Sequence, residues 1–424
     1  MQVDQQIFIP GRNKLAAGET LAPDTSTYEM LQTLSTTWPC LSFDIIPDSL
    51  GDDRKSYPTT LYAVAGTQAD ASREKENELM VMKLSGLSRM DRNNDEESDN
   101  DDSDNEDFEP ILESKSIPLS STTNRIRSHQ CPAANSSVPP TTLTATMTES
   151  GQVLLHDITP HLQSFDNPGT TITPQQSKPL STLRMHKSTE GYAVDWSTLY
   201  PSGKLLTGDN AGLIYATTRT ESGAWVTDTR PYTGHTSSVE ELQWSPSERS
   251  VFSSCSSDGT VKIWDLRSKS HNPALSVRIS NTDVNVMSWS HQTSHLLATG
   301  ADDGVWAVWD LRQWKPAPLS ATSNGAKDLK SAPIASFSFH KEQITSIEWH
   351  PTDDSIVAVA AGDNTLTLWD LAVELDDEES RDTAGIADVP PQLLFVHYME
   401  DVKEAHWHRQ IPGVVVGTGG SGFG

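Results

Sequence analysis

The C-terminal residues contain a spacing of glycines that is typical of a phosphate-binding loop. Gly417, Gly419 and Gly422 fit the pattern G-x-G-x-x-G, and the preceding Val414 to Val416 have strand character. In a dinucleotide-binding unit, such glycines open a helix that meets the pyrophosphate, and an acidic residue follows about 20 positions later. Only two residues follow Gly422. The sequence therefore predicts a turn here, not a cofactor site, and we expect no cofactor.

Histidines, aspartates and tryptophans in the second half suggest catalysis or metal binding. His406 and His408 share one face of a predicted strand, because alternate residues point the same way. A zinc site needs further ligands, and we find none in the sequence. His235, Asp258 and Trp264 belong to a motif that recurs along the chain, whereas a catalytic site uses its residues once. We therefore predict structural roles for these residues, no metal and no enzymatic activity.

The elements that carry these residues are repeats. Four stretches align, starting at Gly191, Ser238, Asp283 and Gln343, and a fifth starts at Asp401. Each has an alternating strand that ends in tryptophan, then a polar turn, an apolar strand and an Asp/Gly/Asn turn. The strand-ending tryptophans are Trp196, Trp244, Trp289, Trp349 and Trp407. Three copies end in Trp-Asp, at Trp264-Asp265, Trp309-Asp310 and Trp369-Asp370. The pattern resembles the WD repeat, whose units are four-stranded propeller blades.

The internal hydrogen-bond network of that repeat is predicted to be partial here. The second copy has all four members, which are His235, Ser254, Asp258 and Trp264. The third copy has Thr299, Asp303 and Trp309 but Ser280 in place of the histidine. The fourth has His340, Asp363 and Trp369 but Val359 in place of serine or threonine. The Gly191 copy lacks the Trp-Asp ending, so we expect a degenerate blade there.

Strand-like segments upstream raise the number of units to seven. Three lie between Cys40 and Leu87, and Asn124 to Thr159 forms a divergent blade. We predict that the strand Cys40–Ile46 completes the last blade, which would otherwise lack its third strand in this chain, because a ring must join its ends to remove an exposed edge. Pro23 to Thr36 is predicted to be a helix. The fold class is thus an all-β seven-bladed propeller with an N-terminal helix and a disordered acidic loop.

Charge narrows the choice of partners. The 424 residues carry a formal net charge of −27, and the sequence pI is about 4.7. Residues 91–109 contain eleven acidic residues and one arginine, and their composition is too polar to order itself. Such a chain repels nucleic acid and gives no reason to bind anionic lipid, so a basic protein is the expected partner. Three widely spaced cysteines favour a reducing compartment.

Several N-terminal segments are more specific than the repeats. IFIPGR, TWPCLSFDIIPDSLGDDR and YPTTLYAVAGTQA, followed by the acidic tract, resemble the glutamate-rich WD-repeat proteins, also called ribosome assembly proteins. The resemblance runs from about Ile7 to Gly424. It implies a monomeric ribosome biogenesis factor in the nucleus and nucleolus, with a cytoplasmic pool. It also implies a dedicated chaperone that captures newly made ribosomal protein L-three and delivers it to pre-60S particles, with no direct nucleic-acid or membrane contact.

A propeller usually binds its partner through the rim where the turns before the first strands emerge. By repeat position this rim is predicted to carry Glu190, Tyr192, Glu240, Asp283, Asn285, Glu342, Gln343, Glu400 and Asp401. The acidic loop adds Asp95, Glu96, Glu97, Asp99, Asp101, Asp102, Asp104, Glu106 and Asp107. An anionic ring of this kind can hold a cationic peptide, and Tyr192 can add a cation–π contact.

The N-terminal architecture also resembles histone-binding WD-repeat proteins, which hold a histone helix between an N-terminal helix and an acidic loop. Histones are basic too, so charge does not separate the two functions, and a ubiquitin-ligase adaptor is a further class. We divide the chain into an N-terminal extension with its helix (1–37), closing strands (38–90), an acidic disordered loop (91–118) and the remaining blades (119–424).

Overall fold

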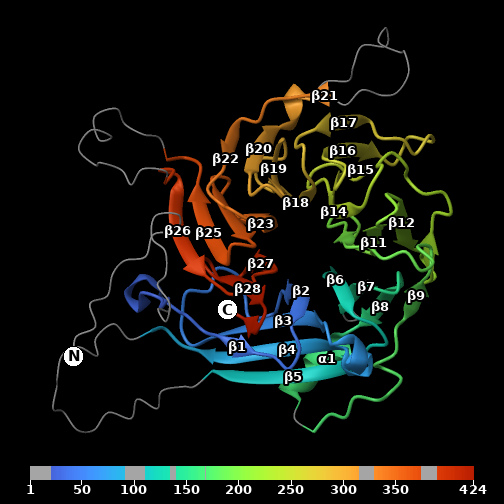
Figure 1. Ribbon diagram of the computed structural model, residues 1–424. Helices are drawn as coiled ribbons and strands as arrows, with labels where there is room; N and C mark the ends of the chain where they lie inside the picture. Colours follow the sequence, from blue (N-terminus) through green and yellow to red (C-terminus); the bar gives the residue numbers. More distant parts are fainter. Residues whose placement is uncertain (1–20, 91–109, 134–139, 168, 315–328, 374–388) are drawn as a thin grey trace.

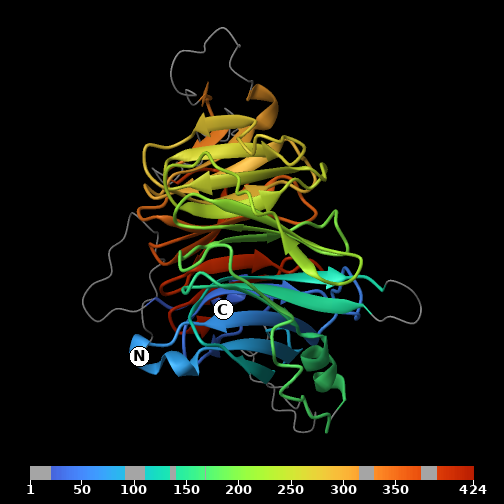
Figure 2. The same ribbon diagram turned by 90° about the vertical axis from the view of Figure 1, so that its right-hand side faces the viewer.

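Seven β-sheets surround a central axis in the computed structural model, which describes residues 21–90, 110–133, 140–167, 169–314, 329–373 and 389–424 (Figure 1). Each sheet is a propeller blade, and its first strand lies nearest the axis. Viewed from the side, the blades stack into a disc (Figure 2). The prediction of a seven-bladed all-β propeller is confirmed.

The first three blades come from the N-terminal half of the chain. Blade 1 consists of β2 (Cys40–Ile46), β3 (Thr59–Thr67), β4 (Glu78–Leu87) and β5 (Ile111–Pro118). Blade 2 consists of β6 (Thr123–Cys131), β7 (Thr141–Thr148), β8 (Val153–Asp157) and β9 (Ser181–Leu183). Blade 3 consists of β10 (Ala193–Trp196), β11 (Lys204–Gly208), β12 (Ile214–Arg219) and β13 (Trp225–Thr227).

The other four blades follow the recognisable repeats. Blade 4 consists of β14 (Val239–Trp244), β15 (Val251–Ser256), β16 (Thr260–Asp265) and β17 (Leu275–Arg278), with the short β21 (Leu329–Lys330) added in parallel at its edge. Blade 5 consists of β18 (Val284–Trp289), β19 (Leu296–Ala301), β20 (Trp306–Asp310) and β22 (Ala335–Phe337). Blade 6 consists of β23 (Ile344–Trp349), β24 (Ile356–Ala361), β25 (Thr365–Asp370) and β26 (Leu393–Tyr398). Blade 7 consists of β27 (Glu404–Trp407), β28 (Val415–Gly419), β29 (Gly422–Phe423) and β1 (Leu34–Ser35).

Helical structure is sparse in the described chain. The helix α1 (Thr159–Asp166) lies on the outside of the ring, where Phe165 joins the apolar contacts between blades 1 and 2 (Figure 1). Short 3-10 turns cover Thr25–Thr27, Ala71–Glu76 and Leu311–Gln313.

Apolar side chains fill the space between every pair of neighbouring blades, in seven separate clusters among the described residues. Tryptophans dominate several of them because alternation along each strand sends these large side chains onto the faces of the sheets. Trp264 in blade 4 and Trp369 in blade 6 are both 0% exposed. The core of this fold is therefore distributed between blades.

The histidine networks have structural roles, as predicted, and they are more complete than the sequence indicated. In blade 4, His235 bonds Asp258 at 2.9 Å and Ser254 at 2.6 Å, and Trp264 donates to Ser254. In blade 6 the network uses Thr367, which bonds His340 at 3.0 Å and accepts from Trp369 at 2.7 Å. Thr367 lies on the neighbouring strand β25, so the valine at position 359 does not break the network.

Blade 3 is less degenerate than predicted. Buried His186 bonds Asp209 at 2.7 Å and Thr207 at 2.8 Å, and its ring lies edge-on to Tyr215. This histidine precedes the repeat that we aligned from Gly191, and therefore the alignment missed it.

The predicted closure of the ring is wrong in its details. Cys40–Ile46 forms β2, the innermost strand of blade 1, and does not complete the last blade. Leu34–Ser35 does so as β1, by pairing with Phe423 and Gly422 of β29. The third strand of blade 7 is present, although only two residues long, so this sheet has four strands. Extended residues 34–35 are drawn into the sheet because β29 would otherwise expose an unpaired edge.

Two further expectations on the N-terminal half are also wrong. Within 23–36 the only helical residues are Thr25–Thr27, because the extended β1 and the contacts of Tyr28 with blade 6 replace the expected helix. Tyr28 donates to or accepts from His397 at 2.8 Å and packs against Phe395. The segment 91–118 is not wholly a loop, since Ile111–Pro118 pairs with β4 as the outer strand of blade 1.

Candidate functional site

One face of the disc is defined by a main-chain contact that recurs in all seven blades. In each, a residue in the turn between the second and third strands donates its amide to a carbonyl just before or at the start of the first strand, over 2.8–3.1 Å. The donor and acceptor pairs are Gln68–Pro39, Glu149–Thr122, Asn210–Glu190, Ser257–Ser238, Asp302–Asp283, Gly362–Gln343 and Gly420–Glu400. We call this the rim face. All nine residues predicted for the rim lie at or next to these junctions.

Tyr192 lies among carboxylates from three blades. Its hydroxyl donates to Glu190 at 2.9 Å, and Asn124 donates to the same carboxylate oxygen at 2.8 Å. Burial, then Glu190, and then Glu240 and Glu149 raise the pKa of Tyr192. Glu149, in blade 2, was not in the sequence prediction because its repeat is divergent. These acids form a continuous negative group across blades 2 to 4.

The group extends into blade 5 through Asp283. Burial and then Asp302 raise the pKa of this exposed carboxylate, and burial raises the pKa of the half-buried Glu240. The Asn285 amide donates to Asp302 at 3.2 Å and to the Ile344 carbonyl at 3.3 Å. Asn285 therefore links blades 5 and 6, whereas Asp283 and Asp302 present charge on the rim face.

The remaining rim residues lie apart from this group. Glu342 and Gln343 precede β23, Glu400 and Asp401 precede β27, and all four are exposed. Asp401 forms an ion pair with Lys403 at 2.6 Å, so part of its charge is neutralised locally. The rim face thus has its strongest negative character over blades 2 to 5.

The acidic-loop residues that were predicted to contact a partner lie outside the described residues. They are Asp95, Glu96, Glu97, Asp99, Asp101, Asp102, Asp104, Glu106 and Asp107. Their role stays a prediction.

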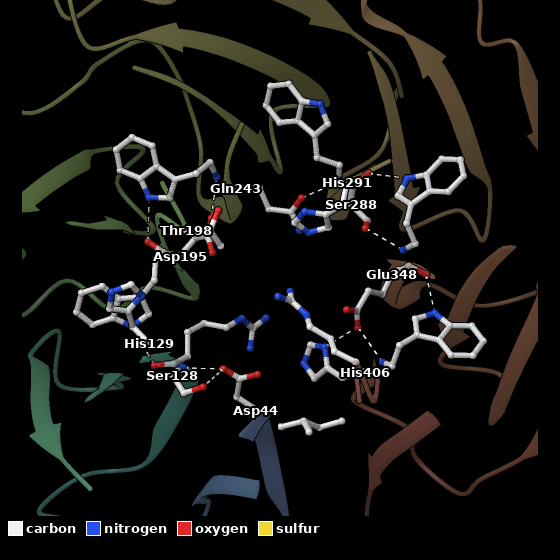
Figure 3. A pocket seen from close by; sticks show the side chains of 18 of the residues that line it. Asp44, Ser128, His129, Asp195, Thr198, Gln243, Ser288, His291, Glu348 and His406 are labelled. Atoms are coloured by element: carbon white, nitrogen blue, oxygen red, sulfur yellow. Dashed lines mark hydrogen bonds and ion pairs between the residues drawn. The ribbon is translucent and has the colours of Figure 1, made fainter. Parts of the chain in front are cut away.

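Two rings of side chains from the seven first strands line the central channel. The outer ring, nearer the rim face, consists of Ser42, Arg125, Ala193, Glu241, Val286, Ser346 and Glu404. The inner ring, two residues further along, consists of Asp44, Arg127, Asp195, Gln243, Ser288, Glu348 and His406. Five inner-ring side chains accept a main-chain amide of the next blade, which joins neighbouring blades around the channel (Figure 3).

Glu404 in blade 7 is the centre of a buried ion-pair network. It accepts from Arg125 at 2.7 Å and Arg127 at 2.8 Å, both in blade 2, and from Ser42 and the Phe43 amide in blade 1. Arg127 also lies 3.7 Å from Glu241 in blade 4, and Arg125 donates to the Tyr192 carbonyl at 2.8 Å. These two arginines therefore cross the channel on its rim side and tie the C-terminal blade to the N-terminal half.

His406 shares this network. Its Nδ1 lies 2.8 Å from Glu348, and its Nε2 lies 3.5 Å from Glu404 (Figure 3). Burial alone would lower the pKa of His406, but Glu404 and Glu348 outweigh it and raise this pKa to about 10. The imidazole is therefore a cation at neutral pH. His408 has a different environment, because its Nδ1 accepts the amides of Gln410 and Ile411, so the two histidines do not converge on a shared ligand.

We expect the stability of the ring to depend on pH through His406. Its folded pKa lies above the usual value of 6.5, so the folded state holds this proton more tightly and the stabilisation is fully present below pH 6.5. It should be lost as the pH rises towards 10, by on the order of a few kcal/mol. Urea unfolding at pH 7 and pH 9.5 should show a larger fall for the native chain than for His406→Asn. Parallel falls in the two proteins would contradict this.

Three observations limit the chemistry of the molecule. Among the described residues, no group of three or more histidine, cysteine or carboxylate side chains is arranged to hold a metal ion. The same residues contain no helix of the length and apolar character that a bilayer crossing requires. Cys40, Cys131 and Cys255 are all free and buried.

Comparison with protein families gives two matches. Residues 18–88 match the family described as histone-binding protein RBBP4 or a subunit of the CAF1 complex. Residues 227–265 and 331–370 match the WD domain, G-beta repeat.

Three curated proteins are similar over nearly the whole chain. Ribosome assembly protein rrb1 of Schizosaccharomyces pombe is 49% identical over 420 residues, which cover 98% of this chain and 83% of that protein. Protein HEAT STRESS TOLERANT DWD 1 of Arabidopsis thaliana is 41% identical over 99% of this chain and 91% of its own length. Glutamate-rich WD repeat-containing protein 1 of Dictyostelium discoideum is 40% identical over 99% of this chain and 84% of its own length.

Proposed function

This chain belongs to the glutamate-rich WD-repeat family of ribosome assembly proteins, and from that membership we propose that it is the dedicated chaperone of ribosomal protein L-three. It binds the newly made protein through the acidic rim face and delivers it to pre-60S particles. It acts in the nucleus and nucleolus, with a cytoplasmic pool where the client is synthesised.

The observation that carries this proposal is the group of carboxylates around Tyr192 on the rim face. Burial and mutual repulsion raise the pKa values of Glu240 and Asp283, so these side chains gain when a cation approaches them. An unassembled ribosomal protein presents many arginines and lysines, and rRNA competes for the same groups. A charge-based hold on the client should therefore weaken as salt rises and yield to RNA.

Binding of histones is the second candidate function. The match of residues 18–88 to a histone-binding family favours it. The segment equivalent to an N-terminal helix is extended over residues 28–36 here, so a helix between 23 and 36 is not available to hold a histone. The ribosomal client is therefore favoured by the relatives and by this difference.

Charge reversal on the rim tests the proposal. The double substitution Glu240→Lys and Asp283→Lys is expected to abolish capture of purified ribosomal protein L-three in biolayer interferometry at low salt, because both carboxylates become repulsive to a cation. The thermal unfolding midpoint should change little, since neither carboxylate forms an ion pair with a described residue.

The matched control reverses two charges elsewhere. Glu221 and Glu248 are exposed in the turns between β12 and β13 and between β14 and β15, on the face opposite the rim. The double substitution of these two to lysine changes the net charge equally and should preserve binding. Equal losses in both double variants would remove the rim from consideration. Tighter binding of histones than of ribosomal protein L-three would favour the second candidate.

A further inference from the structure

The channel contains a cavity of about 510 Å³ on the side away from the rim. Its lining includes the inner ring together with Pro201 and Pro246, which lie in the turns between first and second strands on the opposite face (Figure 3). Arg125 and Arg127 cross the channel on the rim side, so the cavity and the rim are separate sites. Its volume lies within the range of about 300–1,000 Å³ for small-ligand pockets.

The charges on the two rings do not balance. They contain five carboxyl groups and three cations, and each cation pairs with Glu241, Glu348 or Glu404. Asp44 and Asp195, on either side of Arg127 in the inner ring, form no ion pair with any described residue. Each accepts a main-chain amide of the next blade, at 2.6 Å from Ser128 and 2.7 Å from Trp244. A buried carboxylate without a countercharge is unfavourable, and a bound cation would relieve this.

A second group in the lining also lacks a partner. His408 is 2% exposed, and burial lowers its pKa to about 4, so its ring is neutral. Since Nδ1 accepts two amides at 3.1 Å, the proton lies on Nε2. This N–H has no hydrogen-bond partner within the described chain, and the ring lines the cavity. The cavity thus offers two unpaired carboxylates and one unpaired donor.

We propose that this cavity binds a single lysine or arginine side chain of a partner protein, inserted from the face opposite the rim. The cationic group pairs with Asp195 and Asp44, and a carbonyl oxygen of the same residue accepts from His408. The aliphatic stem contacts Trp196 and Trp244, whose rings also line the cavity. Burial raises the pKa of Asp195 to about 7 despite the Trp244 amide and Arg127, in keeping with a carboxyl group that lacks a countercharge. The site does not depend on the identity of the rim's client.

The test uses small capped amino acids and the full chain. N-acetyl-arginine amide and N-acetyl-lysine amide should quench or shift tryptophan fluorescence on binding. N-acetyl-citrulline amide, which has the shape of arginine without its charge, should bind at least tenfold more weakly than the arginine compound. Isothermal titration provides the dissociation constants.

Asp195→Asn should weaken binding of the arginine compound at least tenfold, while its amide oxygen still accepts from Trp244. Asp44→Asn provides a second variant in case the first unfolds. Glu221→Gln, in an exposed turn on the opposite face, should leave the dissociation constant within twofold. The proposal is overturned if the citrulline compound binds as tightly as the arginine compound, if neither asparagine variant weakens binding, or if the native chain shows no binding at millimolar concentrations.

Discussion

Replacing Glu404 by glutamine is expected to destabilise the folded ring by about 3–5 kcal/mol, because it leaves buried cations without their countercharge. Arg125, Arg127 and His406 all lie within 3.5 Å of this carboxylate, which is 2% exposed. Burial would raise the pKa of Glu404, but these three cations reverse the effect and hold it well below its usual range. Glutamine keeps the size and the hydrogen-bond acceptor, so the loss measures the charge. Urea unfolding followed by circular dichroism gives the free energy of unfolding.

The control for this variant is Glu342→Gln, which removes one exposed carboxylate next to β23. A surface substitution of this kind should change the free energy of unfolding by no more than about 0.5 kcal/mol. If Glu404→Gln costs less than about 1 kcal/mol, the network does not hold the two ends of the ring together.

Replacing Gly422 by alanine should open the last blade. Gly422 has a φ of +145°, a conformation that L-residues rarely adopt, and a Cβ at this position would collide with the carbonyl oxygen of Leu34. Backbone strain of this type costs about 1–3 kcal/mol, and the collision also separates β29 from β1. We expect a lower melting temperature and faster hydrogen exchange at the Thr36 amide, which donates to Ser421.

Gly413 provides the comparison for strain alone. Its φ is +78°, and a Cβ there would meet no atom within 4 Å. Gly413→Ala should therefore cost only about 1–2 kcal/mol of left-handed strain and leave exchange at Thr36 unchanged. The closure role of Gly422 is excluded if both alanine variants lose the same stability and exchange Thr36 at the same rate.

The sequence by itself determined the architecture. Period-2 alternation and turn residues are local signals, and they recur often enough to predict seven units and the tryptophans between blades. The strands of blades 1 and 2 were predicted for the same reason, although their repeats are divergent. Rim positions also follow from the repeat, because each first strand begins at the same face.

Only the tertiary structure decided how the ring closes and how its channel is charged. β1 and β29 are two residues each, too short to show a pattern, and they pair across almost the whole chain. Thr367 replaces a lost network member from the adjacent strand, which an alignment by position does not reveal. Glu404 meets Arg125 and Arg127 from the other end of the chain, and Asp44 and Asp195 are left unpaired by that choice. These features depend on which side chains the closed ring brings together, and residues so far apart in sequence carry no local signal of that contact.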